Sequence, residues 1–297
     1  MGSKRTAASA LFEPAETRVK CQRTSAAPGA ASSSPARAVE DTAEHVATVA
    51  AIADTHGVLD DELLLQLSAL GTVDHVLHMG DIGDTQKKSR LPGLALLQRL
   101  REFAGASTPV AAVAGNVDEV DKALMATLPY SRLVDLAGWR LLLVHGHMEG
   151  LQICAHGVMD KGLAALARTE RADVVLFGHS HKPLVAWQGA DGIPLQIAPD
   201  QNNWYLSCGS SSSRDGLLLV NPGSAGPRRF KLPRCWFVLR LHKSSIEIER
   251  RDIGVDQRVC RGANGPPARG AWKSRIVVER AMDAAEPLGI VASSGDH

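Results

Sequence analysis

The chain has 297 residues, of which 44% are hydrophobic and 22% are charged, a composition that excludes a fully disordered or collagen-like protein. The 33 basic and 32 acidic residues give a formal net charge of +1, so the protein has no global electrostatic attraction for nucleic acid or for an anionic membrane. No apolar run approaches the roughly 18 residues that a membrane-spanning helix needs, and we predict no membrane span.

The N-terminal part of the chain differs in composition from the centre. Residues 1–39 carry six basic and two acidic residues among many Ala and Ser, a composition shared by organelle transit peptides and plain disordered extensions. The five cysteines show no C-x-x-C pair, which is typical of isolated thiols in a reducing compartment. We therefore expect a disordered extension over residues 1–44 of a cytoplasmic protein, with import into an organelle by a transit peptide as the alternative.

A single folded domain is expected over residues 45–253, because nearly all regular hydrophobic periodicity lies there. Residues 254–297 are rich in Gly, Pro and Arg without a period, which predicts a disordered C-terminal tail. Within the domain, residues 188–216 are rich in Gly, Asn, Asp and Ser. We interpret this segment as an insertion, either a solvated loop or a lid over a site.

The expected elements alternate between strand and helix in the first half of the domain. In chain order they are a strand at 45–53, a helix at 61–70, a strand at 73–79, a helix at 92–103, a strand at 109–114, a helix at 119–125, a hairpin of 132–136 with 139–144, strands at 174–177, 184–187, 195–198 and 217–220, and a hairpin of 235–241 with 246–251. Alternation predicts parallel pairing, with functional loops at the carboxyl ends of the strands. The domain is therefore α/β at first and mainly β afterwards.

Polar clusters follow five of these strands at the point where each strand ends. They are Asp54-Thr55-His56, Gly80-Asp81, Gly115-Asn116-Val117-Asp118, His145-Gly146-His147 and Gly178-His179-Ser180-His181. Taken singly, each is ordinary turn chemistry or a pair of exposed histidines. Together they would place seven oxygen and nitrogen donors on one edge, and burying such a set without a counter-charge is costly. Bound divalent metal is the simplest explanation.

The donor types indicate the kind and number of ions. Two carboxylates, one amide and four imidazoles exceed what one tetrahedral ion takes, and the lack of thiolate argues against structural zinc. Two ions about 3.5 to 4 Å apart, bridged by an aspartate, suit such a set. Mixed imidazole and carboxylate donors favour transition metals over magnesium or calcium. We expect manganese first, with iron, nickel or zinc as alternatives.

The ordered series of motifs resembles the calcineurin-like metallophosphoesterases, and more closely their small phosphodiesterase branch, which also contains the retromer subunit of the same fold. The late turn Asn221-Pro222-Gly223-Ser224 matches that branch as well. The resemblance covers essentially all of residues 45–253. It implies an α/β fold, a four-layer αββα sandwich of two mixed β-sheets flanked by helices, with a dinuclear metal site at one sheet edge.

Carried across residue by residue, the resemblance implies a role for each position of the motifs. The first ion would be held by Asp54, His56 and His181, the second by Asn116, His145 and His179, and Asp81 would bridge the two. The candidate catalytic residues are Asn116, Asp118 and His147. Asp118 matches a carboxylate that supports the ligands, and its alternative role is an N-cap of the helix predicted at 119–125. His147 matches a position that faces the substrate, and its alternative role is to support the ligands.

The implied reaction is hydrolysis of a small phosphorylated substrate by a metal-bridging hydroxide. Many phosphomonoesterases of the family have a histidine after the motif asparagine, whereas this chain has Val117, which cannot donate a proton. We therefore expect a preference for phosphodiesters. Arg228 and Arg229 follow the late turn and would be surface charges or, alternatively, phosphate contacts.

A second function belongs to a different class, a non-catalytic or weakly catalytic scaffold for protein partners of the retromer-subunit type. That relative has lost part of the histidine and aspartate set, whereas all seven positions are filled here, which favours the enzyme. The sequence carries no specific nucleic-acid signal and predicts no oligomeric state.

Overall fold

The computed structural model describes residues 45–84, 90–148, 161–188, 194–196, 204–208, 216–254 and 275–280. All of these residues belong to one compact unit. The extension predicted over residues 1–44 lies outside the described residues.

The described helices are short and lie between strands. They are α1 (Asp61–Ser68), α2 (Gly93–Ala104), α3 (Lys122–Met125) and α4 (Lys161–Thr169), with a 3-10 turn, η1, at Asp118–Val120. α1 begins after Asp60, whose side chain accepts a hydrogen bond from the Leu63 amide, as N-capping residues do. Its buried Leu63 and Leu67 lie four residues apart on one face. None of the described helices is long and apolar enough to cross a membrane.

The first sheet has seven strands in the order β3-β2-β1-β11-β12-β13-β9. Their bounds are β1 (His45–Ile52), β2 (His75–His78), β3 (Val110–Ala112), β9 (Trp204–Cys208), β11 (Arg234–His242), β12 (Ser245–Ile253) and β13 (Arg275–Arg280). β1, β2 and β3 run parallel, which brings their carboxyl ends to one edge of the sheet. β11 and β12 form the antiparallel hairpin predicted at the end of the domain, and β11 pairs antiparallel with β1.

The second sheet has six strands in the order β4-β5-β6-β10-β7-β8. Their bounds are β4 (Ser131–Leu136), β5 (Trp139–Val144), β6 (Val174–Leu176), β7 (Leu184–Gln188), β8 (Pro194–Gln196) and β10 (Leu217–Asn221). β5, β6 and β10 run parallel, while β4 and β7 pair antiparallel with β5 and β10. This sheet is therefore also mixed, and the ends of β5 and β6 lie together.

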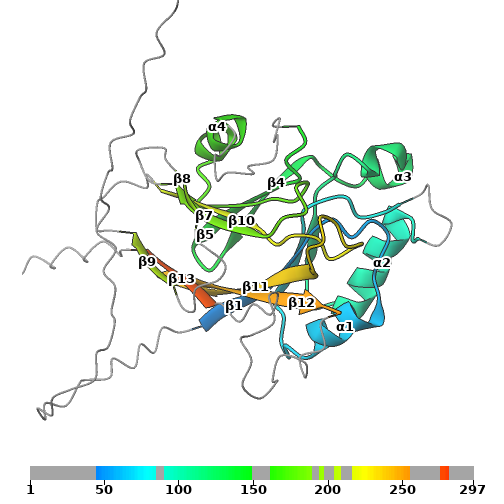
Figure 1. Cartoon of the computed structure of the whole chain (residues 1–297), viewed down its shortest axis with the longest axis horizontal. Helices are drawn as coiled ribbons and strands as arrows, with labels where there is room; N and C mark the ends of the chain where they lie inside the picture. The colour runs from blue at the N-terminus through cyan, green and yellow to red at the C-terminus, as the bar shows by residue number, and fades with distance from the viewer. Residues whose placement is uncertain are drawn as a thin grey trace, which may run out of the picture. The chain divides into compact units, whose positions relative to one another are not determined.

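The two sheets face one another, with α4 outside the second sheet and α1 and α2 outside the first (Figure 1). Val49, Leu141 and Phe237 belong to a buried apolar cluster built from both sheets. Separate clusters join the first sheet to α1, α2 and α3, and the second sheet to α4. Each sheet thus buries both faces, which explains the uninterrupted apolar runs of its central strands. The predicted four-layer αββα sandwich is confirmed.

The tail predicted over residues 254–297 requires a correction at β13. Arg275–Arg280 pair antiparallel with β12 and parallel with β9, so the first sheet extends beyond residue 253. The run Ile276-Val277-Val278 consists of β-branched residues, which favour strands. The segment 188–216, interpreted as an insertion, likewise supplies two strands, β8 and β9. Residues 255–274 and 281–297 lie outside the described part of the chain.

Candidate metal centre

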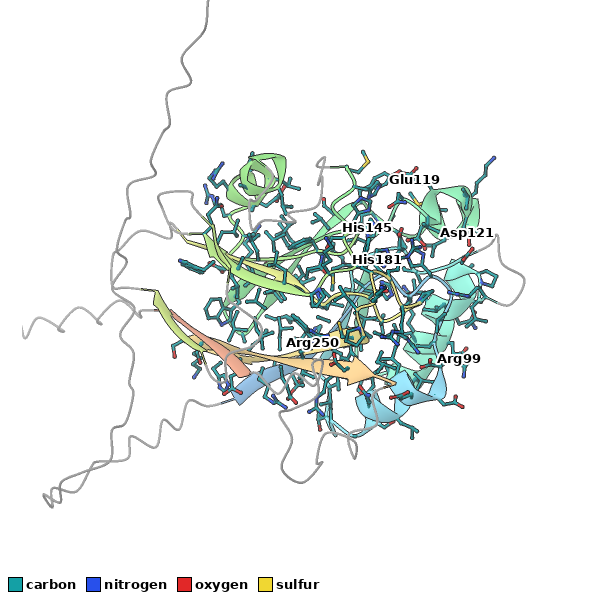
Figure 2. The ribbon with its side chains drawn as sticks, viewed as in Figure 1. Arg99, Glu119, Asp121, His145, His181 and Arg250 are labelled. Atoms are coloured by element: carbon teal, nitrogen blue, oxygen red, sulfur yellow. The ribbon has the colours of Figure 1, made fainter. Side chains whose placement is uncertain are left out.

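The five polar clusters converge from both sheets. Asp54 and His56 follow β1, Asp81 follows β2, and Asn116 follows β3, all in the first sheet. His145 follows β5, and His179 and His181 follow β6, in the second sheet. His145 and His181 lie close together at one end of the facing sheets (Figure 2). The site is therefore built across the interface between the sheets.

The backbone at this edge adopts a conformation that side chains other than glycine rarely take. The residues with positive φ include Asp54 (52°), His56 (45°), Asp81 (52°), His179 (64°) and His181 (55°). Each such residue costs about 1 kcal/mol or more, and such strain is concentrated at functional sites. The strand ends thus turn sharply enough to direct these side chains towards one point.

Four of the predicted ligands form one compact donor group, namely Asp54, His56, Asp81 and His181, whose ligating atoms all lie within 4.8 Å of one another. The Nε2 atoms of His56 and His181 are 3.4 Å apart. Nε2 of His181 is 3.5 Å from Asp54 Oδ1, and Nε2 of His56 is 3.6 Å from Asp81 Oδ2. All four residues are at most 9% exposed.

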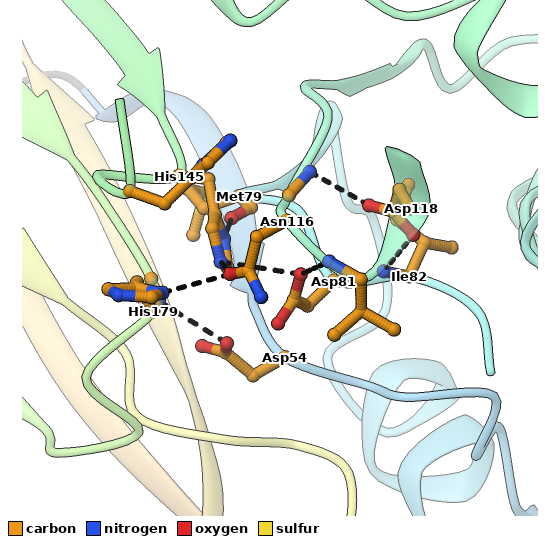
Figure 3. A network of polar contacts seen from close by, with 12 residues as sticks. Asp54, Met79, Asp81, Ile82, Asn116, Asp118, His145 and His179 are labelled. Carbon is orange, nitrogen blue, oxygen red and sulfur yellow. Dashed lines mark hydrogen bonds and ion pairs between the residues drawn. The ribbon is translucent and has the colours of Figure 1, made fainter. Parts of the chain in front are cut away.

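The other three predicted ligands meet beside this group. Asn116 Oδ1 lies 3.2 Å from His145 Nε2 and 3.0 Å from His179 Nδ1, and Figure 3 shows these contacts together with the backbone hydrogen bond from His179 to Asp54. Nδ1 of His145 lies 2.7 Å from the Met79 carbonyl oxygen. A proton on Nδ1 would satisfy that carbonyl and leave Nε2 as the atom available to a metal.

Asp81 is the residue shared by the two groups. Its Oδ2 faces His56, while its Oδ1 lies 3.4 Å from His145 Nε2 and accepts a hydrogen bond of 2.8 Å from the Val117 amide. A Cβ atom at Gly115 would overlap Asp81 Oδ1, so only glycine allows this close approach. The carboxylate therefore presents one oxygen to each group.

Asp54 and His181 are each held in the neutral form. Burial raises the pKa of the Asp54 carboxyl to about 8, and the charge of Asp81 adds to the rise. Burial lowers the pKa of His181 to about 3, and His56 lowers it further. Burial also lowers the pKa of His56 and of His179. Neutral imidazole is the form that binds a metal.

Asp81 and His145 form an ion pair between the two groups. Burial opposes ionisation of Asp81, but its hydrogen bond with His145 lowers the pKa of the carboxyl to about 2. Burial likewise opposes the charged form of His145, but its hydrogen bond with Asp81 raises the pKa of the imidazole to about 9. A metal ion at this position would replace the proton of His145.

The donor set fits divalent transition metal. Asp54 Oδ2 and His181 Nδ1 are buried and have no hydrogen-bond partner among the described residues, and unsatisfied buried polar atoms are costly. Imidazole nitrogens with carboxylate and amide oxygens are ligands for manganese, iron, nickel or zinc. The seven predicted positions could therefore hold metal, as their residue types suggested.

Asp118 supports the two loops that carry Asp81 and Asn116. Its Oδ1 accepts hydrogen bonds from the amides of Ile82 (2.9 Å) and Gly83 (3.1 Å), and its Oδ2 accepts one from Gly115 (2.9 Å). Burial raises the pKa of this carboxyl to about 6, against the effect of those hydrogen bonds.

The alternative role of Asp118 as an N-cap is wrong. Asp118 is the first residue of η1, whose N-cap position is occupied by Val117, and its carboxylate accepts from Ile82, Gly83 and Gly115. The helix predicted at 119–125 is divided, because Asp121 accepts a hydrogen bond from Leu124 and caps a separate helix, α3.

His147 lies at the rim of the site. Its Nε2 is 3.2 Å from Glu119 Oε1, and its ring is 5.3 Å from that of His145 and 5.8 Å from that of Tyr130. Only 11% of its side chain is exposed. The ring therefore adjoins the second donor group without belonging to it, and Glu119 fixes its orientation.

Several residues that hold the site together have no predicted role. The Asn221 amide donates to the Gly178 carbonyl (2.8 Å) and to Ser180 Oγ (3.0 Å), and Ser224 Oγ donates to the Asp54 carbonyl (2.9 Å). Thr55 Oγ1 donates to the Ile82 carbonyl (2.9 Å). The Asn-Pro-Gly-Ser turn was the only signal for two of these residues, and it did not indicate what they contact.

The chain matches one family model and is similar to several solved structures. A family model described as the calcineurin-like phosphoesterase superfamily domain matches residues 48–244. Similar solved structures include a Streptococcus pneumoniae protein described as a predicted phosphoesterase (20% identity over 69% of this chain and 89% of that chain, TM-score 0.43). Another is the phosphoesterase YfcE of E. coli, with 22% identity over 70% of this chain and 100% of that chain and a TM-score of 0.40. A third is Vps29 of Entamoeba histolytica in complex with zinc, with 21% identity over 71% of this chain and 94% of that chain and a TM-score of 0.43. A search of curated proteins found no match.

Proposed function

Because this chain belongs to the calcineurin-like phosphoesterase superfamily, we propose that it is a metal-dependent phosphoesterase that acts on phosphodiester-type bonds. One observation carries the proposal: Asp81 presents its two oxygens to two separate donor groups, towards His56 on one side and His145 on the other. Two metal ions sharing one carboxylate are the arrangement used for phosphoryl transfer.

The residues divide between the two ions as the two donor groups do. Asp54, His56 and His181 would hold one ion, Asn116, His145 and His179 would hold the other, and Asp81 would contact both. When bound, a pair of divalent ions supplies an activated water molecule and neutralises the charge of the phosphoryl oxygens. Manganese is our first choice among the ions that suit these donors.

The three candidate catalytic residues would have different roles. Asn116 would bind metal and, through its contacts with His145 and His179, would also hold these two histidines of the second sheet in place. Asp118 would hold the loops that carry Asp81 and Asn116 in fixed positions relative to each other. His147 would face the substrate, held by Glu119, and supply a proton or a hydrogen bond to the phosphoryl group.

The test of the proposal is metal analysis of the purified protein combined with a phosphodiesterase assay. We expect two equivalents of transition metal in the wild type, and loss of hydrolysis by about 100-fold or more in Asp81→Asn and His145→Ala. Asp61→Asn, at an exposed carboxyl in α1, and His75→Ala, at the opposite end of β2, are matched controls that should retain activity. Hydrolysis unchanged in Asp81→Asn would exclude the bridging role.

Substrate preference follows from Val117. A valine cannot protonate a poor leaving group, so an aryl phosphodiester should be hydrolysed faster than an alkyl phosphomonoester. Steady-state kinetics with bis(4-nitrophenyl) phosphate and glycerol phosphate test this. Faster turnover of the monoester would contradict it.

The scaffold function is the alternative, and the same experiments separate it from the enzyme. A scaffold of the retromer-subunit type can retain metal, but it would show no hydrolysis that depends on Asp81. The complete set of seven donors supports the enzyme, because a binding surface alone would not require it.

A further inference from the structure

A cavity of 430 Å³ adjoins the metal-ligand cluster. It is lined by His56, by Asp84 and by four consecutive residues, Pro227 to Phe230. Because His56 is a proposed ligand, the cavity opens directly from the proposed metal centre. Apart from His56, the reaction outlined above uses none of these residues.

The turn that lines this cavity is fixed to the segment that carries Asp54 and His56. The Ala225 amide donates to the Ala53 carbonyl (3.0 Å), and the Gly226 amide donates to the Asp54 carbonyl (3.1 Å). A Cβ atom at Gly226 would overlap the carbonyl oxygens of Asp54 and Thr55, so the two backbones touch. Residues 227–230 therefore leave from an anchored point next to the metal ligands.

Of the two arginines in residues 227–230, Arg229 is the one whose side chain has no partner among the residues that the structure describes. Arg228 Nε donates to the Leu232 carbonyl (3.3 Å), and Arg234 bonds to Asp60 and to the Ala225 carbonyl. Arg229 is exposed, its backbone carbonyl accepts a hydrogen bond from the Leu232 amide (2.9 Å), and its guanidinium makes no hydrogen bond or ion pair with any other described residue. Its guanidinium is nevertheless close to the site, because its charge lowers the pKa of Asp54, of His56 and of His181.

The surroundings of Arg229 are positive and partly aromatic. Lys182, directly after the proposed ligand His181, places its Nζ 5.2 Å from the centre of the Phe230 ring, and 59% of Phe230 is exposed. Asp84 is the acidic residue of the cavity lining and is itself buried. Two arginines against one buried carboxylate leave the lining with an excess of positive charge.

A guanidinium near two divalent ions is repelled by them unless an anion lies between. The transferred phosphoryl group would already be bound by the metals. Arg229, which lines the cavity, would therefore be available to bind a different anionic group. Guanidinium recognises phosphate and carboxylate with two parallel hydrogen bonds. We propose that the cavity beside His56 binds the alcohol portion of the substrate, and that Arg229 there contacts a second anionic group, a phosphate or a carboxylate.

This inference rests on the proposed phosphoesterase function, and its test has to separate the two. Phosphonates suit this purpose because they occupy a phosphoryl site without being hydrolysed. We would titrate metal-loaded protein with phenylphosphonate, 4-carboxyphenylphosphonate and the longer 4-(carboxymethyl)phenylphosphonate by isothermal titration calorimetry. The proteins are the wild type, Arg229→Ala, Arg229→Lys, and Arg99→Ala as a control at an exposed arginine on α2.

In the wild type, we expect at least one carboxylated phosphonate to bind about tenfold more tightly than phenylphosphonate. Arg229→Ala should abolish that difference in affinity and should leave the affinity for phenylphosphonate within about twofold of the wild type. Arg229→Lys should retain part of the difference, and Arg99→Ala should retain all of it. Equal affinities of the wild type for all three probes, or an unchanged difference in Arg229→Ala, would overturn the assignment.

A parallel kinetic experiment shows which proposal has failed, should one fail. The substrates are 4-nitrophenyl phenyl phosphate and its 4-carboxyphenyl counterpart, in which water attacks phosphorus and 4-nitrophenolate leaves. Arg229→Ala should lower kcat/KM about tenfold for the carboxylated diester only. If the wild type hydrolyses neither diester but the phosphonate difference depends on Arg229, the subsite stands and the phosphoesterase proposal falls.

Discussion

Protonation of single residues determines how this site would take up metal. Asp54 and His145 both hold a proton near pH 7, since their pKa values are about 8 and about 9. Asp81 is ionised and His181 is neutral, with pKa values of about 2 and about 3. Ligation requires an ionised carboxylate and a neutral imidazole, so Asp54 and His145 are the residues whose protons compete with the metal.

Metal binding should therefore release protons, and affinity should rise with pH. Both competing pKa values lie above 7, so lowering the pH from about 8 to about 6 strengthens the competition and weakens binding, by about tenfold per pH unit for each proton displaced. Calorimetric titration of metal-stripped protein with Mn²⁺ at about pH 7, in buffers of different ionisation enthalpy, counts the released protons.

A variant identifies the source of those protons. Asp54→Asn removes one titrating group, so the number of protons released should fall by about one, although the asparagine binds metal more weakly. A binding heat that does not change with the buffer would contradict the expected proton release.

The proposed ligand residues stand out in the sequence because they occupy fixed positions after apolar runs. Residues that act through one particular contact do not. Glu119 is an ordinary acidic residue of a polar segment, and only the packing of η1 beside the second sheet brings it to His147. Arg228 and Arg229 are adjacent arginines that the sequence alone does not distinguish. In the structure, the side chain of Arg228 donates a hydrogen bond to the Leu232 carbonyl, whereas that of Arg229 does not.

Among the elements of the fold, the loops after β2 and β3 depend on each other. Asp118 accepts hydrogen bonds from Ile82 and Gly83 of the first loop and from Gly115 of the second. The loop that carries Asp81 is thereby tied to the loop that carries Asn116. The buried carboxylate of Asp118 therefore helps to position two proposed ligands, Asp81 and Asn116.

Asp118→Ala should accordingly lower the stability of the protein more than a substitution of the nearby helix cap Asp121. It leaves three buried amides without their acceptor, so the free energy of unfolding should fall by about 3 kcal/mol or more. Asp121→Ala, which removes the N-cap of α3, should cost about 1 kcal/mol. Urea unfolding of both variants measures the difference, and metal content should fall only in Asp118→Ala. Equal losses of stability would contradict the bracing role.

The elements predicted from sequence are those with long apolar or leucine periodicity, such as β1, α2 and the β11–β12 hairpin. α4 was not predicted, because its sequence, Lys161-Gly-Leu-Ala-Ala-Leu-Ala-Arg-Thr169, is short and contains a glycine. Asp160, directly before it, is a residue type that favours N-caps, but it did not outweigh the weak periodicity. β9 and β13 are short runs flanked in the sequence by polar or small residues, and β13 pairs with both β12 and β9. Pairing between segments so far apart in sequence is not visible locally.

For the molecule as a whole, the order of the first sheet makes β9 dependent on the end of the chain. β9 joins this sheet through β13, which lies between it and β12. Five residue pairs connect β13 to β12, and five connect it to β9. The sheet edge is therefore completed by residues beyond the motif-bearing domain.

Removal of residues 255–297 should destabilise the protein although it leaves every proposed ligand in place. Losing the pairing of β13 exposes the edge of β12 and detaches β9, which should lower the free energy of unfolding by about 2 kcal/mol or more and promote association through the open edge. Urea unfolding and size-exclusion chromatography test this, with a chain ending after Arg280 as the control. Unchanged stability of the shorter chain would show that β13 is dispensable.

Donors from both sheets meet at the proposed centre, so a bound ion would act as a reversible cross-link between two layers otherwise held by apolar packing. Its contribution would depend on free metal, rising by about 1.4 kcal/mol for each tenfold increase in concentration above the dissociation constant of a site. The resistance of the folded sandwich to heat and proteolysis would then follow the metal supply of the cell, and starvation for metal would remove the protein as well as its activity.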